Sequence, residues 1–278
     1  STVSVITTIS FDHTKSLGDT IEKIAFEKAG IIKKNTPLIL GNITEEAKKV
    51  IKKRASKFNA PILEYGRDFS ISNIRVNELG TSFNYQSHEL NLENITVNLL
   101  GKHQACNAAT AISAFIMFLH KTNRKINEQK IYDALANVNW QGRMQIISQK
   151  PIVIIDGAHN EEGIRALRDN LTEIFPNKKI YFVLAILRDK NLGNIIKNIC
   201  SVSYKIYITK NKSARAAEIE DQVRFVKLHD KPFEIHEDVT AATKKAISDA
   251  NEDDIVMISG SLYTISEVIK EKTSIINL

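Results

Sequence analysis

The second half of the sequence alternates strand-like and helix-like segments. Runs rich in β-branched and aromatic residues occupy 151–156, 179–186, 204–209 and 254–259, and segments with helical periodicity separate them. Parallel strands need long crossover connections, which are usually helices. The alternation therefore predicts an α/β domain, in which a parallel sheet carries helices on both faces.

The first half mixes helices and strands less regularly. The spacing of apolar and β-branched residues predicts strands over 3–9 and 37–40, a small antiparallel β segment over 68–100, and helices over 19–29, 44–58, 102–120 and 127–136. Gly30 suits the C-cap of the first helix. Phe115 is expected on the buried face of the third. Five lysines in the second helix lie off its apolar stripe, and we interpret them as a solvated face.

Length and composition limit the class of protein. With 278 residues and 43% hydrophobic content, two domains with a core each are expected, 1–142 and 143–278. The net charge of +6 is small for a nucleic-acid binder, and the longest apolar stretch, 108–119, is too short to cross a bilayer. The two cysteines form no metal or disulfide motif. We expect a soluble, cytoplasmic protein with no nucleic-acid or membrane partner.

Two residues near the start could carry chemistry. His13 follows the first predicted strand, where open α/β sheets place ligand contacts, although a capping or packing role also fits. Lys28 occupies the next position on the apolar stripe of the first helix. Such a lysine can snorkel, pair with Glu22 or Glu27, or lose its proton because burial lowers its pKa. A neutral lysine can add carbon dioxide, and the carbamate formed could bind Mg²⁺ through oxygen.

Three further candidates lie close to predicted element ends or to the domain break. Asn107 is near the start of the third helix, where an amide could cap, pack or contact a base. Arg143 at the break could bridge the domains or neutralise a phosphate. Asp156 ends a strand and opens the segment DGAHN, so it could line a ligand crevice or cap the helix that follows.

The chain contains, in this order, the motifs DHTKSLGDTIEKIAFEKAGIIK, GKHQACNAATA, GRMQIIS, IIDGAHN and SGSLY. Together they resemble the folylpolyglutamate synthase and dihydrofolate synthase branch of the Mur ligase superfamily, over nearly the whole chain. The resemblance implies that residues 1–142 form the end of a P-loop-type ATPase domain and that 143–278 form a Rossmann-like C-terminal α/β domain. It also implies an ATP-dependent ligase, in which the amino group of L-glutamate attacks the acyl phosphate of a folate or dihydropteroate carboxylate.

The same resemblance implies roles for individual residues. His13 resembles an Mg²⁺ ligand, and Lys28 resembles a carbamylated lysine of the metal site. Nucleotide contacts are implied for three residues, namely Asn107, Arg143 and Asp156. His159 and Ser261 resemble positions near the incoming glutamate and the acyl phosphate. Bringing a carboxylate and a phosphate together requires Mg²⁺ and basic side chains, because the two anions repel each other.

One departure from the family pattern is large. A phosphate-binding loop of the form GxxxxGK[ST] is absent from the 278 residues, and so is the glutamate that the family places upstream of Asp12-His13. The chain resembles the C-terminal two-thirds of such a ligase, as a fragment, a split-gene product or a degraded gene. We expect it to be inactive alone, with a separate N-terminal fragment as a possible partner. The alternatives are a non-catalytic nucleotide- or ligand-binding remnant and a fragment of a peptidoglycan-type Mur ligase.

Overall fold

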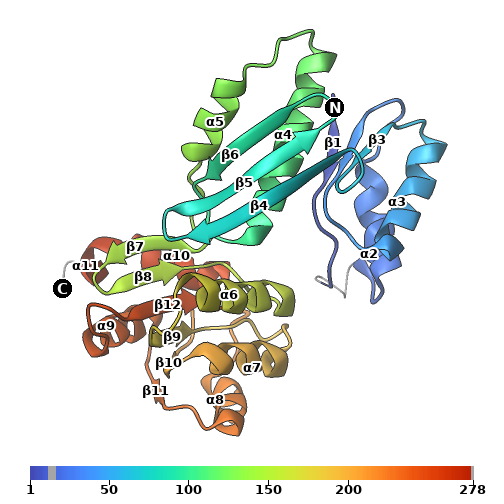
Figure 1. Cartoon of the computed structure of the whole chain (residues 1–278). Coiled ribbons are helices and arrows are strands. Elements are labelled where there is room, and N and C mark those ends of the chain that lie inside the picture. The colour runs from blue at the N-terminus through green and yellow to red at the C-terminus, as the bar shows by residue number, and fades with distance from the viewer. Residues whose placement is uncertain (12–16, 277–278) are drawn as a thin grey trace. The chain divides into compact units, whose positions relative to one another are not determined.

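The structure is a computed structural model that describes residues 1–11 and 17–276. The chain divides into two compact units, Ser1–Asn139 and Trp140–Leu278 (Figure 1). Each unit contains both helices and parallel strands, as expected for an α/β protein. Within the described ranges, no helix is both long and apolar enough to cross a membrane.

A three-stranded parallel sheet organises the start of the first unit. Its order is β1 (Ser4–Ile6), β2 (Leu38–Leu40) and β3 (Ile62–Glu64). Successive side chains of a strand point to opposite faces. Ile6, Leu38 and Leu40 accordingly pack with the helices α2 (Ile21–Lys28) and α3 (Glu45–Lys57), whereas Ile39 belongs to the core on the other side. Thr20 and Thr44 cap the two helices through their side-chain oxygens.

A long helix and an antiparallel sheet complete this unit. The helix α4 (Lys102–Lys121) packs against Ile39 and against the inner face of β4 (Phe69–Asn77), β5 (Gly80–Ser87) and β6 (Asn91–Val97). The helix α5 (Glu128–Ala136) covers β6. Gly80 has φ +143°, and a Cβ there would lie 2.6 Å from the carbonyl oxygen of Val97, so the turn that starts β5 requires glycine.

The second unit is a six-stranded sheet between two groups of helices. Its order is β11 (Phe233–Ile235), β10 (Lys205–Ile208), β9 (Ile180–Leu184), β12 (Ile255–Ser259), β8 (Ile152–Ile155) and β7 (Gln145–Gln149). Only β7 runs antiparallel to its neighbour. The doubly wound arrangement expected for this half is confirmed.

The helices of the second unit form one group on each face of the sheet. In the first group, α6 (Glu161–Ile174), α7 (Leu192–Val202) and α8 (Ile219–Val226) contact one another in sequence order, and the short 3₁₀ turn η2 (Lys227–His229) follows α8. The second group comprises α9 (Val239–Asp249), α10 (Leu262–Lys270) and α11 (Lys272–Ile276). Because parallel strands share one direction, the turns that follow β8, β9, β10 and β12 lie at one edge of the sheet.

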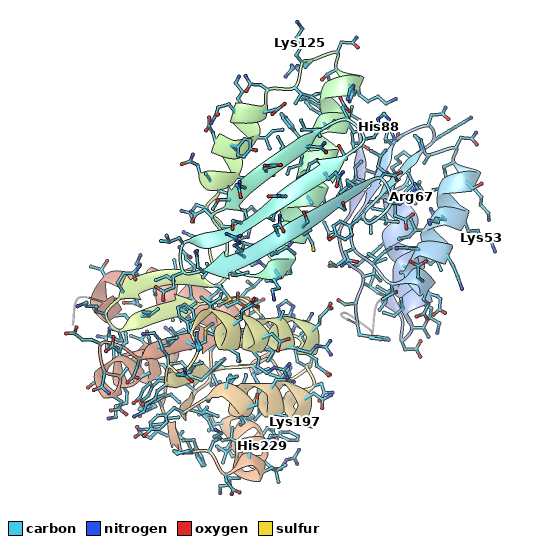
Figure 2. The ribbon with its side chains drawn as sticks, in the orientation of Figure 1. Lys53, Arg67, His88, Lys125, Lys197 and His229 are labelled. Carbon is cyan, nitrogen blue, oxygen red and sulfur yellow. The ribbon has the colours of Figure 1, made fainter. Side chains whose placement is uncertain are left out.

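Some local expectations were wrong. The helix α2 does not end at a glycine C-cap, because a 3₁₀ turn η1 (Ala29–Ile31) continues it through Gly30. Phe115 on α4 is 44% exposed rather than buried. The lysines of α3 are not all solvated: Lys53 points outward (Figure 2), but Lys48 is only 15% exposed.

Candidate functional site

Lys28 lies beside the turn that follows β1. It is the last residue of α2 and half-buried, and its Nζ atom donates a hydrogen bond to the carbonyl oxygen of Thr8 at 2.9 Å. Ile24 and Ala25 on the same helix face are fully buried, so the stripe predicted from sequence does point inward. This places the lysine at the carboxyl end of a parallel strand, where α/β sheets commonly bind ligands. His13 lies outside the described residues.

Asn107 occupies the exposed side of α4, one turn after its start. Its Nδ2 atom donates to Gln104 Oε1 at 3.2 Å on the same helix. The neighbouring Cys106 contacts the hydroxyl of Tyr65, which follows β3, with 3.8 Å between the sulfur and the oxygen. Burial raises the pKa of Tyr65 to about 12, so its hydroxyl stays protonated at neutral pH. Asn107 therefore lies in the first two turns of α4, next to Cys106. The contact of Cys106 with Tyr65 joins this part of the helix to the carboxyl end of the parallel sheet.

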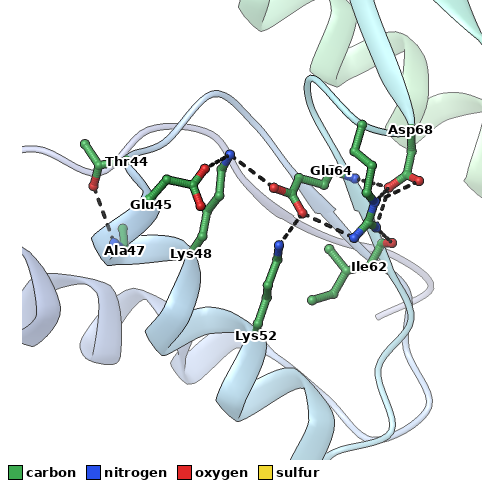
Figure 3. A network of polar contacts seen from close by, with 9 residues as sticks. Thr44, Glu45, Ala47, Lys48, Lys52, Ile62, Glu64 and Asp68 are labelled. Carbon is green, nitrogen blue, oxygen red and sulfur yellow. Dashed lines mark hydrogen bonds and ion pairs between the residues drawn. The ribbon is translucent and has the colours of Figure 1, made fainter.

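A buried carboxylate in this region was not foreseen from sequence. Glu64, the last residue of β3, is 5% exposed. Its carboxylate faces Lys48, Lys52 and Arg67 (Figure 3), at 3.1 Å from Lys48 Nζ, 2.7 Å from Lys52 Nζ and 3.4 Å from an Arg67 nitrogen. Burial pushes the pKa of Glu64 up, but the ammonium groups of Lys52 and Lys48 outweigh burial and hold it below its ordinary value. The cluster fixes the turn that carries Tyr65.

Asp156 is the one acidic side chain among the predicted site residues, and it is buried. It follows β8 and is 8% exposed, and its two oxygens accept hydrogen bonds from the backbone N–H groups of Met144 and Ala158, both at 2.8 Å. Burial raises the pKa of Asp156, while these two bonds and the charge of Arg143 act in the opposite direction. It does not cap α6, because Asn160 supplies that cap. The carboxylate instead joins the β8 turn to the segment that enters β7.

Arg143 and His159 lie on either side of this carboxylate in sequence. Arg143 is exposed, and its neighbour Met144 is held by Asp156, so the backbone that carries the guanidinium is fixed. His159 is half-buried, and its Nδ1 atom lies 2.9 Å from the carbonyl oxygen of Gly157. A carbonyl can only accept, so Nδ1 carries the proton of this bond. In the neutral ring, Nε2 is then the basic nitrogen.

Ser261 has a structural role in this unit. Its side chain is 0% exposed and caps α10 by accepting from the backbone N–H of Thr264 at 3.1 Å. The Ser261 and Thr264 hydroxyls are 2.7 Å apart, and Asn211 Nδ2 donates to each of them at 3.1 Å. The hydroxyl is enclosed by protein in this structure, and its hydrogen bonds fix the start of α10.

Sequence reasoning missed two arginines and a tyrosine at the same edge of the sheet. Arg188 follows β9 and Arg215 follows β10, and both are exposed. Arg215 pairs with Asp189 at 2.6 Å, and its carbonyl oxygen accepts from the backbone N–H of Arg188. Tyr263, at the start of α10, is 49% exposed. Only the strand order, which places the turns after β9, β10 and β12 together, brings these residues to one edge.

The described residues contain no cluster of three metal-ligating side chains. Mg²⁺ takes oxygen ligands, mostly carboxylates and water. Within 1–11 and 17–276, no group of three or more His, Cys, Asp and Glu side chains could hold a metal ion. Of the two metal-site residues that the resemblance implies, Lys28 lies within the described residues and His13 lies outside them.

Both halves of the chain match known families. Residues 1–115 match the Mur ligase middle domain, and residues 142–262 match the glutamate ligase domain of Mur ligases. The dihydrofolate synthase/folylpolyglutamate synthase of Bacillus subtilis is 34% identical over 269 residues, which are 96% of this chain and 62% of that protein. The folylpolyglutamate synthase of Lacticaseibacillus casei is 31% identical over 266 residues, with 96% and 61% covered.

Solved structures agree with these matches. The folylpolyglutamate synthase of Mycobacterium tuberculosis complexed with ADP has a TM-score of 0.88 at 26% identity, covering 96% of this chain and 62% of its own. Escherichia coli FolC in complex with DHPP and ADP has a TM-score of 0.85 at 28% identity, covering 98% and 61%. This chain thus spans less than two thirds of the length of these relatives. It belongs to the Mur ligase family, with sequence from both the middle domain and the glutamate ligase domain.

Proposed function

We propose that this chain is part of an ATP-dependent amide ligase that joins L-glutamate to a folate or dihydropteroate carboxylate. The observation that carries the proposal is the placement of Lys28 and Asp156, each at the carboxyl end of a parallel strand, in the units that match the two Mur ligase domains. The relatives named as folylpolyglutamate and dihydrofolate synthases, and the ADP in two of the solved structures, support the same chemistry.

The proposed reaction has two steps. The γ-phosphoryl group of ATP is transferred to the folate carboxylate, which releases ADP and leaves an acyl phosphate. The amino nitrogen of glutamate then attacks the acyl carbon, the amide bond forms, and inorganic phosphate leaves. Both steps bring anions together, so positioned cations and hydrogen-bond donors lower their barriers.

The nucleotide contacts that we propose are Asn107, Arg143 and Asp156. Arg143 can give a phosphate two parallel hydrogen bonds from its guanidinium. Asp156 supports that contact, because it fixes the backbone at Met144 and so limits where the guanidinium can reach. The exposed amide of Asn107 remains able to donate and accept towards a ligand, since its intrahelical contact uses one Nδ2 proton.

We further propose that His13 and a carbamylated Lys28 help to hold Mg²⁺, which would offset the phosphate charge. The position of Lys28 supports this role, because its Nζ atom is hydrogen-bonded to the carbonyl oxygen of Thr8. Thr8 lies only five residues before His13 in the sequence. Carbamylation replaces one N–H bond of the neutral amine with a bond to carbon. The remaining N–H can still donate to Thr8, so the observed contact is compatible with the modified side chain.

The acceptor amine must lose a proton as it attacks. His159 suits this task, because Nδ1 is committed to Gly157 and Nε2 is the basic nitrogen of the neutral ring. Arg188 and Arg215 lie at the same edge of the sheet and can offset the charge of the glutamate carboxylates. Ser261 then serves as a positioning residue at the start of α10.

Catalysis also needs a phosphate-binding loop, and none of the 278 residues supply one. We propose that polypeptide outside these residues provides it, in a longer form of the chain or as a separate fragment. For the test, we define the restored chain as this chain joined at its start to the N-terminal part of the Bacillus subtilis relative, up to the residue at which the similarity begins.

Growth of a bacterial strain without its own folate ligase tests the function. The restored chain should rescue growth and this chain alone should not, because only the former has a phosphate-binding loop. Restored chain with Lys28→Ala should fail, and the matched control Lys53→Ala, at an exposed lysine of α3, should rescue. Rescue by the Lys28→Ala form, or no rescue by an expressed and folded restored chain, would contradict the proposal.

A further inference from the structure

Asn211 is a buried amide with no part in the proposed chemistry. It follows β10 and is 2% exposed. Its Nδ2 atom donates towards Ser261 Oγ and Thr264 Oγ1, each at 3.1 Å, and lies 3.5 Å from the carbonyl oxygen of Ala185. Its Oδ1 atom accepts from the backbone N–H of Ser213 at 3.1 Å. One side chain therefore joins the turn after β10 to the first turn of α10.

The chemistry of these contacts requires an amide. The Thr264 hydroxyl donates its own proton to the carbonyl oxygen of Ala185 at 2.8 Å, so towards Asn211 it can only accept. An aspartate of the same shape would place an oxygen against that hydroxyl oxygen, and it would bury a charge. Because Ala185 follows β9, the contacts of Asn211 and Thr264 together connect the turns after β9, β10 and β12.

The turn that Asn211 holds carries the exposed cation Arg215. From Asn211 the turn is fixed in steps: Oδ1 accepts from Ser213, the Ser213 hydroxyl accepts from the backbone N–H of Arg215 at 3.2 Å, and Lys212 N–H donates to Glu267 on α10 at 2.7 Å. The backbone of Arg215 is thus tied to the buried amide, while its guanidinium pairs with Asp189 on the turn after β9 at 2.6 Å through one nitrogen and keeps further N–H groups for a second carboxylate. A shift of the amide would move the cation along the edge of the sheet.

We infer that Asn211 is a positioning residue for binding of the acidic amino acid. Its hydrogen bonds hold residues 211–215 against the start of α10, and this fixes the position at which the Arg215 guanidinium can bind a carboxylate of the ligand. The inference rests on the proposed function for the identity of that amino acid. Without these hydrogen bonds, glutamate binds more weakly, whereas the nucleotide contacts at Arg143 and Asp156 keep their geometry.

Steady-state kinetics of the restored chain give the first test. Asn211→Asp should raise KM for L-glutamate by about tenfold, the loss expected for one or two misplaced hydrogen bonds, and change KM for ATP by less than about twofold. A general loss of folded protein would instead lower kcat and would not change the KM for L-glutamate more than the KM for ATP. The matched control is Asn170→Ala, which removes another buried amide (6% exposed) from α6 and should leave both KM values unchanged.

Thr264 provides a second pair of variants in case Asn211→Asp does not fold. Thr264→Val removes the hydroxyl that accepts from Asn211 and should shift KM for glutamate in the same direction, whereas Thr264→Ser keeps the hydroxyl and should restore the wild-type value. Equal changes in the KM for glutamate and for ATP, or a wild-type glutamate KM for Asn211→Asp, would overturn the inference.

Hydrogen exchange of this chain alone separates the inference from the proposed function. In Asn211→Ala, which removes the Oδ1 acceptor of the Ser213 amide, or in Thr264→Val if the former does not fold, the backbone amides of residues 213 and 264 should exchange at least about tenfold faster, while those of Met144 and Ala158 stay protected. If the restored wild type has no ligase activity, the proposed function fails, and hydrogen exchange alone then decides whether Asn211 holds residues 211–215 in place. Unchanged exchange at Ser213 and Thr264 would then refute the positioning role.

Discussion

Replacement of Glu64 by glutamine tests whether the lysines of α3 stabilise the fold or only face solvent. The variant keeps the size of the side chain but removes the charge that Lys48, Lys52 and Arg67 surround. Loss of one partner of a buried ion pair costs about 3–5 kcal/mol, and this value must be reduced because Lys52 and Arg67 are 42% and 55% exposed. We expect Glu64→Gln to lower the free energy of unfolding of the first unit by about 2 kcal/mol at pH 7.

The effect should depend on pH in a defined direction. The folded structure holds the pKa of Glu64 below its ordinary value of 4.5, although burial opposes this shift. Its stabilising contribution is therefore present above the pKa of the unfolded chain and is lost as the pH falls through the folded pKa. The difference between wild type and Glu64→Gln should shrink as the pH is lowered from 5 towards 3.

Hydrogen exchange measured by mass spectrometry is the suitable assay, because peptides that cover β2 and β3 report on this unit alone. Glu89→Gln is the matched control, since Glu89 pairs with His120 at the surface at 2.8 Å and should contribute less than about 0.5 kcal/mol. A Glu64→Gln variant within about 0.5 kcal/mol of wild type at pH 7, or a difference that grows in acid, would refute the reasoning.

Three further variants test other parts of the structure. Gly142→Ala should destabilise the second unit by about 1–3 kcal/mol in thermal unfolding, because φ is +70° and the new Cβ would overlap Ile265 Cδ1. Asp249→Asn should destabilise it near pH 7 but not in strong acid, since hydrogen bonds led by Lys205 outweigh burial and lower the pKa of Asp249; urea unfolding at several pH values checks this. Arg143→Ala in the restored chain should raise KM for ATP about tenfold with unchanged thermal stability, because the side chain is exposed.

The regular elements could be predicted where the sequence repeats a clear period. The helix expected over 44–58 is α3, with Thr44 as its cap, and the four strands expected in the second half became β8, β9, β10 and β12. Three short strands, β3, β7 and β11, were missed. They have three to five residues, and at that length the pairing partner across the sheet decides the structure rather than the local sequence.

The candidate site could be predicted only in part, because distant residues complete it. The inward position of Lys28 followed from helical spacing, and the place of Asp156 followed from the strand before it. The contact of Lys28 with Thr8, the charge cluster of Glu64 and the buried amide of Asn211 depend on which turns the strand order brings together. A single sequence does not contain that information in its local periodicity.

The proposed ligase activity is tested most directly by product analysis of the restored chain. Purified restored chain is incubated with ATP, Mg²⁺, L-glutamate and either dihydropteroate or a reduced folate, and ADP and the folate product are followed by mass spectrometry. We predict that one ADP forms for each glutamyl residue added, and that Lys28→Ala abolishes both products. ADP release without a glutamylated product, or glutamylation without ADP, would contradict the proposed acyl phosphate route.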